Sequence, residues 1–428
     1  MLKSVVFFEF HHKLDLVNSA KRLGYRIILI TKKPTKTAKA NFDRILICDW
    51  TKKGALDNAV EELKSTEKVK AVLTNYEHFV VQRAYLSQLL GLSAPDVFSA
   101  CATRNKAIQR MALNALQENI DNALVCSLKD AEKYFTKFGG DVFLKSIAGI
   151  KSRHVFHVKS KKELIDAWKK FQKSVKKESL DKELYDDFSY LNIDFDYPNP
   201  AKNLLIEKAC YGRQVAVSAL IMKDKVWHTP SFTDIYTAAN IGRDDSFLAF
   251  RILPSQHQNQ FNTKLDKLVE KITKELKLKS CAFFADFILT PQDELKIIEV
   301  ASRIGGYRPM MYRAVYNFDL TGLHIKSLVG EDLFKLQESK KTKPKKFVSL
   351  CEFFPKENGK LVKILNLSKL KNDPQLLWLN VKAKKGQEVG FAKDGYEPSV
   401  VALLQGATYD EVYKKSLFYQ TLLDIEVE

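Results

Sequence analysis

Residues 1–100 alternate short apolar runs with amphipathic segments that have helical spacing. The pattern predicts strands and helices in turn, with helices ending near Gly24 and Gly91. The predicted strands are Val5–Phe8, Arg26–Thr31, Ile45–Cys48 and Ala71–Thr74, and the predicted helices are Leu14–Leu23, Ala55–Leu63 and Phe79–Leu90. This order is typical of an α/β domain whose parallel sheet is covered by helices. The segment has no GxGxxG motif, so the dinucleotide fingerprint is absent.

Further along the chain, two apolar runs predict a β-hairpin. The runs are Phe283–Thr290 and Leu295–Ala301, and the polar segment Pro291–Glu294 between them suits a turn. With the turn centred at the middle of this segment, pairing by equal offsets places Asp286 directly opposite Glu299.

These two acidic residues indicate either a metal site or ion pairs. Cross-strand neighbours have Cβ atoms about 4.5–5.5 Å apart, where like charges repel. Each carboxylate also lies among large apolar residues, where an unpaired charge is costly. A Mg²⁺ ion held by the carboxylates and by substrate phosphates would relieve both costs. Pairing of Asp286 and Glu299 with surface Lys or Arg is the alternative, and the hairpin alone does not decide between them. Arg303 follows Glu299 at an even offset, so it faces the same side if the strand continues.

Basic residues occupy unusual places after the first hundred residues. An amphipathic helix is predicted over residues 101–116, with Lys106 in its first turn, where a cation opposes the helix dipole unless an anion is near. Lys145 lies in the apolar strand VFLKS, and a buried ammonium group needs a partner. The loop that follows contains glycine, Ser152 and Arg153, and such a loop can wrap a triphosphate with its backbone N–H groups.

The rest of the pattern predicts further helices and strands up to the C-terminus. These elements are the helices Lys161–Lys177, Thr263–Leu276 and Thr408–Leu417, the hairpin Val215–Met222 with Lys225–His228, and the strands Val155–Val158, Phe347–Phe354, Gly359–Ile364, Leu376–Lys382 and Gly386–Ala392. The lysine-rich stretch Lys340–Lys346 is typical of a linker or an exposed edge.

Composition excludes several classes of protein. The 428 residues are 45% hydrophobic and 28% charged, as in a soluble globular protein of about two to four domains. The six cysteines are scattered, without a CxxC pattern, which favours a reducing compartment, and we expect a cytoplasmic protein. No apolar run approaches the roughly 20 residues that span a bilayer, and the N-terminus lacks a signal-peptide cleavage site. The net charge of +18 is not accompanied by a nucleic-acid motif, so we expect no specific nucleic-acid partner and no membrane association.

The predicted hairpin resembles the metal-binding hairpin of the ATP-grasp superfamily. FFADFIL followed by IIEVASRIGG is similar to the branch of carboxylate–amine ligases related to biotin carboxylase and carnosine synthase, in which an acid is followed by E-x-N-x-R on the next strand. The resemblance implies that Asp286 and Glu299 bind Mg²⁺ and that Arg303 is catalytic. Ala301 stands at the Asn position, which in the family usually supplies a third oxygen to the metals.

The resemblance also implies an ATP site. Lys106 and Lys145 match lysines that contact the nucleotide phosphates. Ser152 and Arg153 match the phosphate loop, in which His154 replaces a family Gly.

The segment LIEKACYGRQ resembles the adenine hinge of the same family. Glu207 matches the residue that accepts from the adenine amino group, with a strand-end salt bridge as the alternative. The backbone from Lys208 to Cys210 would meet the edge of the ring, and Gln214 replaces the usual ribose-contacting Glu.

Two further matches lie at the substrate end of the predicted site. Arg308 lies where family members often place a group that holds the carboxylate of the acceptor, and a surface arginine is the alternative. Glu77 matches an acid that is common at that strand end, and an acid favoured by the dipole of a helix N-terminus is the alternative.

By this resemblance the fold class is α/β. Residues 1–100 would form a Rossmann-like preATP-grasp domain, residues 101–334 an ATP-grasp domain of two α+β subdomains, and residues 335–428 a small β-rich C-terminal lobe.

The implied reaction is ATP-dependent ligation of a carboxylate to an amine or thiol through an acylphosphate, with ATP and Mg²⁺ as cofactors. Arg303, Lys145 and Arg308 would be the catalytic residues. Departures from the family pattern leave two alternatives open, a nucleotide-binding protein without ligase activity and a phosphoryl-transfer enzyme. Small-molecule carboxylates and amines are the implied partners, and a homodimer is compatible with the resemblance.

Overall fold

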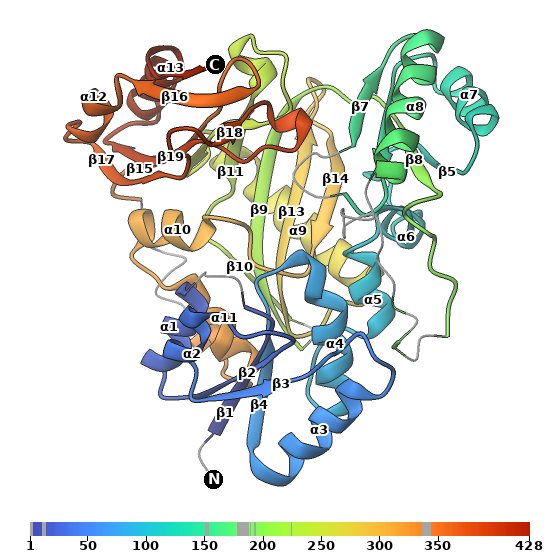
Figure 1. The fold of residues 1–428 in the computed structure, drawn as a ribbon, viewed down its shortest axis with the longest axis vertical. Coiled ribbons are helices and arrows are strands. Elements are labelled where there is room, and N and C mark those ends of the chain that lie inside the picture. The colour runs from blue at the N-terminus through green and yellow to red at the C-terminus, as the bar shows by residue number, and fades with distance from the viewer. Residues whose placement is uncertain are drawn as a thin grey trace.

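The computed structural model describes residues 3–10, 14–149, 154–177, 188, 190–191, 194–223, 225–335 and 344–428. Figure 1 shows the N-terminal domain at the bottom, a smaller antiparallel unit at the upper right, and a long sheet that runs from the centre to the upper left. Within the described residues, no helix is long and apolar enough to cross a membrane. The cysteines, all of which belong to this part of the chain, are free thiols.

The N-terminal domain contains a parallel sheet of strand order β3-β2-β1-β4. Its strands are apolar runs that helices cover, as a parallel sheet requires. The strands are β1 (Lys3–Phe8), β2 (Arg26–Thr31), β3 (Arg44–Ile47) and β4 (Lys68–Leu73), and the helices are α1 (Asp15–Arg22), α2 (Lys36–Asn41), α3 (Ala55–Thr66), η1 (Glu77–Phe79), α4 (Val80–Leu89) and α5 (Val97–Ala102). The predicted α/β domain is therefore confirmed, with element ends within a few residues of the predicted ones.

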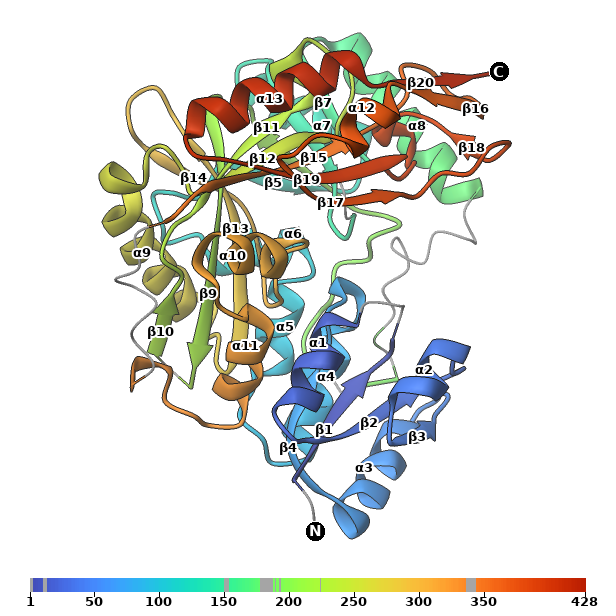
Figure 2. The same cartoon turned by 90° about the vertical axis from the view of Figure 1, so that its left-hand side faces the viewer.

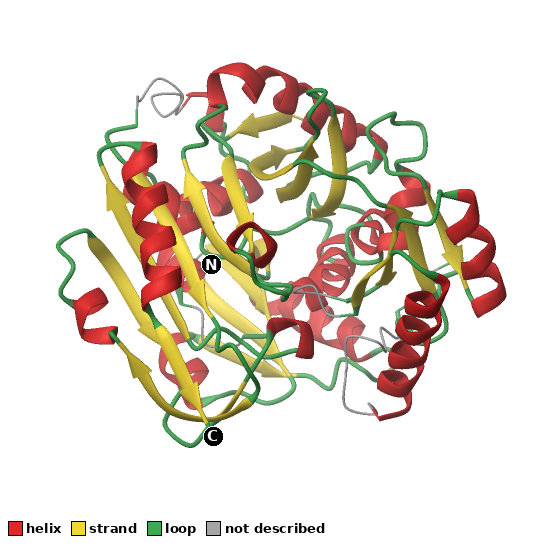
Figure 3. Ribbon diagram, turned by 90° about the horizontal axis from the view of Figure 1, so that it is seen from above, coloured by secondary structure: helices red, strands yellow, loops and turns green. Residues whose placement is uncertain are grey.

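The smaller unit is an antiparallel sheet of order β5-β8-β6-β7. Helices α7 and α8 share an apolar core with these strands. The elements are β5 (Asn122–Val125), α7 (Leu128–Lys137), β6 (Val142–Ser146), β7 (Val155–Val158), α8 (Lys161–Lys177) and β8 (Leu204–Lys208). Seen from above, this unit and the long sheet stand on opposite sides of the molecule (Figure 3).

The long sheet has the order β14-β13-β9-β11-β12-β15-β19-β17, with β10 beside β9. Its strands are β9 (Arg213–Met222), β10 (Lys225–His228), β11 (Thr233–Thr237), β12 (Leu248–Leu253), β13 (Cys281–Leu289), β14 (Leu295–Ala301), β15 (Phe347–Phe353), β17 (Leu376–Val381) and β19 (Val400–Gly406). The domain boundary expected at residue 335 falls between β14 and β15, yet β12 pairs with β15, so one sheet extends across it.

Helices from different parts of the chain pack on this sheet. Helix α9 (Gln258–Glu275) packs its apolar side on β9 and β13, and α13 (Tyr409–Leu422) lies across the C-terminal strands (Figure 2). The helix pair α10 (Arg308–Tyr316) and α11 (Leu320–Leu328) follows β14, and α11 packs against α1 of the N-terminal domain. The remaining elements are η2 (Ala238–Ile241), β16 (Gly359–Leu365), α12 (Leu367–Lys371), β18 (Glu388–Val389), η4 (Ala392–Asp394) and β20 (Asp424–Val427).

The helix predicted over residues 101–116 is wrong in its extent. Helix α5 ends at Ala102, and a new helix, α6 (Lys106–Ala112), begins after Asn105, whose side chain accepts from the backbone N–H of Ala107 at 3.0 Å. An Asn cap of this kind starts a helix, so the apolar periodicity across it belongs to two elements. Met111 in α6 is 61% exposed.

The turn from β8 into β9 needs glycine at one position. A Cβ on Gly212 would lie 2.2 Å from the carbonyl oxygen of Leu289, and the φ angle of Gly212 is +153°. The close approach fixes this turn against the end of β13.

We expect Gly212→Ala to lower the free energy of unfolding by about 1–3 kcal/mol, because the added methyl group must displace the backbone of Leu289. Urea unfolding of the purified variant measures the change. Gly306→Ala is the control, since nothing lies within 4 Å of its added Cβ. Equal stability of the two variants would contradict the close approach.

Candidate active site

The two carboxylates predicted to face each other do so. Asp286 on β13 pairs with Glu299 on β14. Figure 1 shows these two strands near the centre of the molecule. The turn differs from the predicted one, because Leu289 pairs with Leu295 and the turn is therefore centred on Gln292. A β-bulge on β14 compensates for this shift and restores the pairing of the two acids.

The bulge lies at Ile298 and is held by helix α6 and the segment after it. Arg110 donates to the carbonyl of Ile298 at 2.7 Å, and the N–H of Ile297 donates to the carbonyl of Glu118 at 2.8 Å. Gln109 donates to the carbonyl of Val300 and accepts from its N–H. These bonds fix the edge strand that carries Glu299.

Cationic groups from separate elements converge on the acidic pair. Lys106, at the first turn of α6, lies 3.3 Å from Glu299 and donates to the carbonyl of Gly149 at 2.8 Å. Arg303 is ion-paired with Glu77, which follows the carboxyl end of β4. The structure thus brings together Lys106, Arg303 and both predicted metal ligands, and it adds Glu77 as the partner of Arg303.

The pKa values of the two acids move in opposite directions. Burial raises the pKa of Asp286, and the charge of Glu299 raises it further. Burial also acts to raise the pKa of Glu299, but Lys106 and Arg303 outweigh it and hold this pKa below the usual range. Oδ1 of Asp286 is buried without a hydrogen-bond partner in the described structure.

Two buried arginines lie beside Asp286. Arg308, at the start of α10, is 2% exposed, and Arg251, on β12, is 9% exposed. Burial and the neighbouring charge of Arg251 lower the pKa of Arg308 to about 10. Arg251 is ion-paired with Glu352 at 3.1 Å, whereas no acidic partner of Arg308 is found in the described part of the chain. The Nε of Arg308 and one Nη of Arg251 have no hydrogen-bond partner. Arg308 is therefore not a surface arginine, and the two guanidinium groups form an incompletely satisfied cationic pair.

A second cluster of charged side chains surrounds Glu207 on the antiparallel unit. Glu207 is 1% exposed and accepts from Arg110 and from Lys145, each at 2.5 Å. Burial alone would raise the pKa of Glu207, but the two cations outweigh it and hold the pKa at about 2. Lys145 thus has the partner that its place in an apolar strand demands.

The predicted hinge residues follow Glu207 along the chain. The N–H of Lys208 donates to the carbonyl of Asp121 at 2.9 Å, which anchors the hinge backbone. Cys210 is half-buried, and burial raises the pKa of its thiol. Gln214 lies on β9, where it pairs with Ile288 of β13. These placements are compatible with the predicted roles and do not test them.

The predicted phosphate loop is only partly described. Ser152 and Arg153 lie outside the described residues. His154 has a φ angle of +52°, which is the left-handed region that glycine adopts at little cost. A Gly at this position would adopt the same conformation at a lower cost.

Sequence reasoning missed Arg110 and Arg251. Arg110 lies in a short helix with no local sign of its long-range partners, Glu207 and Ile298. Arg251 lies in the apolar strand LAFRIL, the same signal that identified Lys145. That signal predicts a buried cation with a functional or ion-pair partner.

The carboxylate oxygens of the acidic pair suit a Mg²⁺ ion that is also bound by phosphate oxygens. Within the described part of the chain, no group of three or more His, Cys, Asp or Glu side chains is placed to hold a metal. Mg²⁺ is commonly bound through one or two carboxylates plus waters and phosphate oxygens. Asp286 and Glu299 supply the two carboxylates, and Oδ1 of Asp286 has no other use in the structure.

Comparison with known proteins identifies the fold. Residues 17–93 match the family model of the ATP-grasp N-terminal domain. The L-amino acid ligase from Bacillus licheniformis superposes with a TM-score of 0.77 at 16% identity, covering 100% of this chain and 99% of that chain. Phosphoribosylglycinamide synthetase from Anaerococcus prevotii gives 0.67 at 16% identity, with 100% of both chains covered.

A third structure and one negative result complete the comparison. The biotin carboxylase domain of the Hydrogenobacter thermophilus 2-oxoglutarate carboxylase, in complex with MgADP and bicarbonate, gives a TM-score of 0.67 at 14% identity, covering 100% of this chain and 91% of that chain. No curated protein sequence matches the chain. The chain has the ATP-grasp fold, so the predicted fold class and the resemblance are confirmed.

Replacing Glu207 with Gln removes the charge that Arg110 and Lys145 share, and we expect it to cost about 3–5 kcal/mol of stability at pH 7. The folded-state pKa of Glu207 is about 2, below its usual 4.5. Its contribution to stability is therefore complete above the unfolded-state pKa and is lost as the pH falls toward 2.

The stability difference between wild type and Glu207→Gln should consequently narrow on acidification. Urea unfolding at a series of pH values measures it. Glu388→Gln, at an exposed position on β18, is the control and should show no such trend. A difference that stays constant down to about pH 2.5 would contradict the assigned ion pair.

Proposed function

We propose that this chain, which has the ATP-grasp fold and an ATP-grasp N-terminal domain, is an ATP-dependent ligase that joins a carboxylate to an amine or thiol. ATP would phosphorylate the carboxylate, the nucleophile would displace phosphate from the acylphosphate, and ADP and phosphate would leave. The facing pair of Asp286 and Glu299, surrounded by cationic side chains, is the observation that carries the proposal. The MgADP complex of the biotin carboxylase domain supports ATP and Mg²⁺ as cofactors.

The acidic pair would hold the metal, and lysines would hold the phosphates. Mg²⁺ bound by Asp286 and Glu299 supplies positive charge next to the phosphate oxygens. Lys106 already lies 3.3 Å from Glu299, so its ammonium group is placed to contact a phosphate bound there. Lys145 would contact the phosphates from the antiparallel unit, kept in place by Glu207. Catalysis of this kind is mostly positioning and electrostatics, and it needs no nucleophilic side chain.

Arginines would hold the carboxylate substrate and the transferring phosphoryl group. Arg303 extends from the end of β14 and is oriented by Glu77. Arg308 and Arg251 are buried and have unused donors, and a planar anion would satisfy both. We therefore assign Arg303 and Arg308 the catalytic roles that the sequence predicted, and add Arg251 to them.

The nucleotide would lie between the antiparallel unit and the hairpin. In this proposal the backbone from Lys208 to Cys210 meets the adenine ring, and Gln214 contacts the ribose. The phosphate loop, with Ser152 and Arg153, would close over the phosphates.

The free cysteines and the proposed reaction suggest a cellular compartment and a class of substrates. The free cysteines fit a reducing compartment, so we place the enzyme in the cytoplasm, acting on small-molecule carboxylates and amines. The homodimer stays a prediction.

A nucleotide-binding protein without turnover is the second candidate. Ala301 pairs with Phe284 and offers no oxygen where the family pattern has Asn. A metal would then have only two protein carboxylates, which weakens its binding.

Assays of ADP release distinguish these candidates. With Mg²⁺, ATP and a panel of amino acids, we expect at least one carboxylate to stimulate ADP release, with an amide or thioester detected by mass spectrometry. A phosphorylated product without an amide would identify phosphoryl transfer instead. Binding of ATP without turnover on any substrate would support the second candidate.

Substitutions at the hairpin test the metal site. Glu299→Gln keeps the shape of the side chain, so we expect the fold to persist while ADP release falls by about 100-fold or more and Mg²⁺·ATP no longer raises the melting temperature. Ala301→Asn adds an oxygen ligand and should increase the affinity for Mg²⁺. Glu294→Gln, in the turn of the same hairpin, is the matched control. Unchanged turnover and unchanged stabilisation in Glu299→Gln would show that the metal assignment is wrong.

A further inference from the structure

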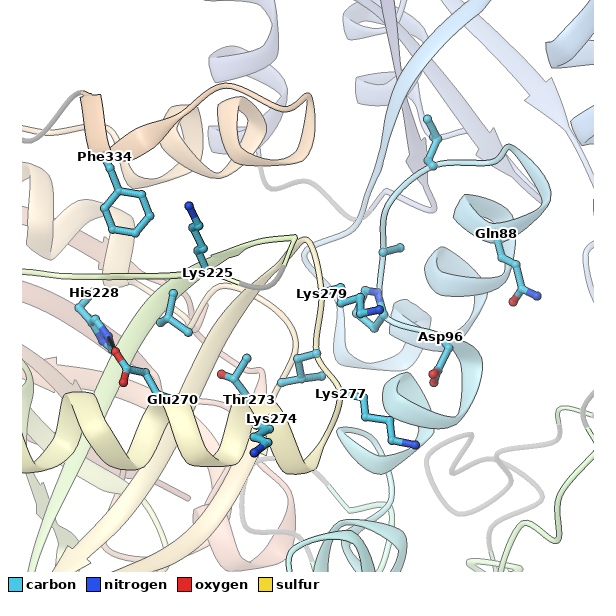
Figure 4. Close-up of a pocket in the computed structure, with 15 residues that line it drawn as sticks. Gln88, Asp96, Lys225, His228, Glu270, Thr273, Lys274, Lys277, Lys279 and Phe334 are labelled. Atoms are coloured by element: carbon cyan, nitrogen blue, oxygen red, sulfur yellow. Dashed lines mark hydrogen bonds and ion pairs between the residues drawn. The ribbon is translucent and has the colours of Figure 1, made fainter.

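A large cavity lies apart from the residues of the candidate active site. It is open to solvent and has a volume of about 1020 Å³, just above the range of about 300–1,000 Å³ typical of ligand pockets. One wall is the segment from the end of α4 to the start of α5, and the other is formed by β10, the C-terminal half of α9 and the residues leading into β13 (Figure 4).

Lysines from different elements line this cavity without partners. They are Lys225 on β10, Lys274 on α9, and Lys277 and Lys279 after α9. No ion pair of these ammonium groups is found within the described residues. All four lysines are exposed, so their ammonium groups are hydrated and accessible to a ligand.

The acidic residues of the cavity are already engaged. Asp96 caps helix α5 by accepting from the N–H of Ser99 at 2.7 Å. Glu270 lies 3.2 Å from His228, whose other ring nitrogen lies 3.0 Å from Asp266. Asp96 and Glu270 keep their negative charges, but the four lysines outnumber them, so the cavity lining has a positive balance.

The lining also contains a buried donor and an apolar surface. Thr273 is 5% exposed, and its hydroxyl has no hydrogen-bond partner in the described structure. A buried hydroxyl without a partner is unfavourable, and a ligand oxygen would relieve it. Apolar contacts are available from Leu92, Ala94, Pro95, Val226, Leu278 and Phe334.

We propose that this cavity is a second binding site, for a small organic anion that carries a phosphate or carboxylate group on an apolar body. The lysines would bind the anionic group, and the apolar wall would bind the body of the ligand. The ligand would bridge the α4–α5 segment and the residues that lead into β13, the strand of Asp286. The site goes beyond the proposed ligase reaction and does not depend on it.

Titration with naphthyl compounds tests the proposal. The probes are 1-naphthyl phosphate, 1-naphthoate and neutral 1-naphthol, followed by naphthyl fluorescence in the presence of saturating Mg²⁺ and a non-hydrolysable ATP analogue. We expect an anionic probe to bind at least tenfold more tightly than naphthol, and the ranking of the two anionic probes to show which acid the site prefers.

Variants locate the binding. Lys225→Ala combined with Lys279→Ala should abolish the preference for the anion, whereas Lys267→Ala combined with Lys360→Ala, at exposed positions outside the cavity, should keep it. Thr273→Val should weaken binding of the anion while raising the melting temperature without ligand. No binding or equal binding of all three probes in the presence of the nucleotide analogue, or an unchanged preference in the cavity variant, would each overturn the proposal. Turnover of ATP is measured separately, so failure of this site and failure of the ligase proposal are distinguishable.

Discussion

Two carboxylates held opposite each other on neighbouring strands are the constraint around which this molecule is built. Asp286 is buried and faces the like charge of Glu299, and both effects raise its pKa. Such a pair persists only where positive charge surrounds it. The cations come from separate helices and strands between residues 106 and 308: Lys106 from α6, Arg251 from β12, Arg303 after β14 and Arg308 from α10. The relative placement of these elements therefore determines the electrostatics of the site.

Much of this arrangement was predictable because it depends on local patterns. Strands of the N-terminal domain are apolar runs ended by turn residues, and their ends were predicted to within a few residues. The facing of Asp286 and Glu299 was also predicted, although the assumed turn was wrong by half a residue and the bulge at Ile298 corrected it. With the observed turn, an unbroken register would place Ile298 opposite Asp286 and turn Glu299 to the other face of the sheet. The extra residue in the bulge shifts the register by one and brings Glu299 back opposite Asp286.

What could not be predicted depends on contacts between distant residues. A pattern along one strand shows which side chains share a face, but it does not show their partners. Arg110 meets Glu207 from the antiparallel unit, and both are nearly inaccessible to water, so this contact arises only when the units assemble. The long sheet, which extends across the domain boundary expected at residue 335, is a similar case. Its strands β12 and β15 are hydrogen-bonded neighbours although they are far apart in the sequence. Arg251 is different, because a cation in the apolar strand LAFRIL was enough to predict a buried charged residue from the sequence.

The continuity of this sheet affects how the chain is made on the ribosome. Strand β12 ends at residue 253 and its neighbour β15 begins at residue 347. At about 5–20 residues per second, β15 is translated roughly 5–20 s after β12. During that interval β12 presents a row of unpaired backbone groups, the kind of edge that recruits strands from other chains. The nascent chain thus exposes an aggregation-prone strand edge after its N-terminal domain has been synthesised, until β15 is available to cover it.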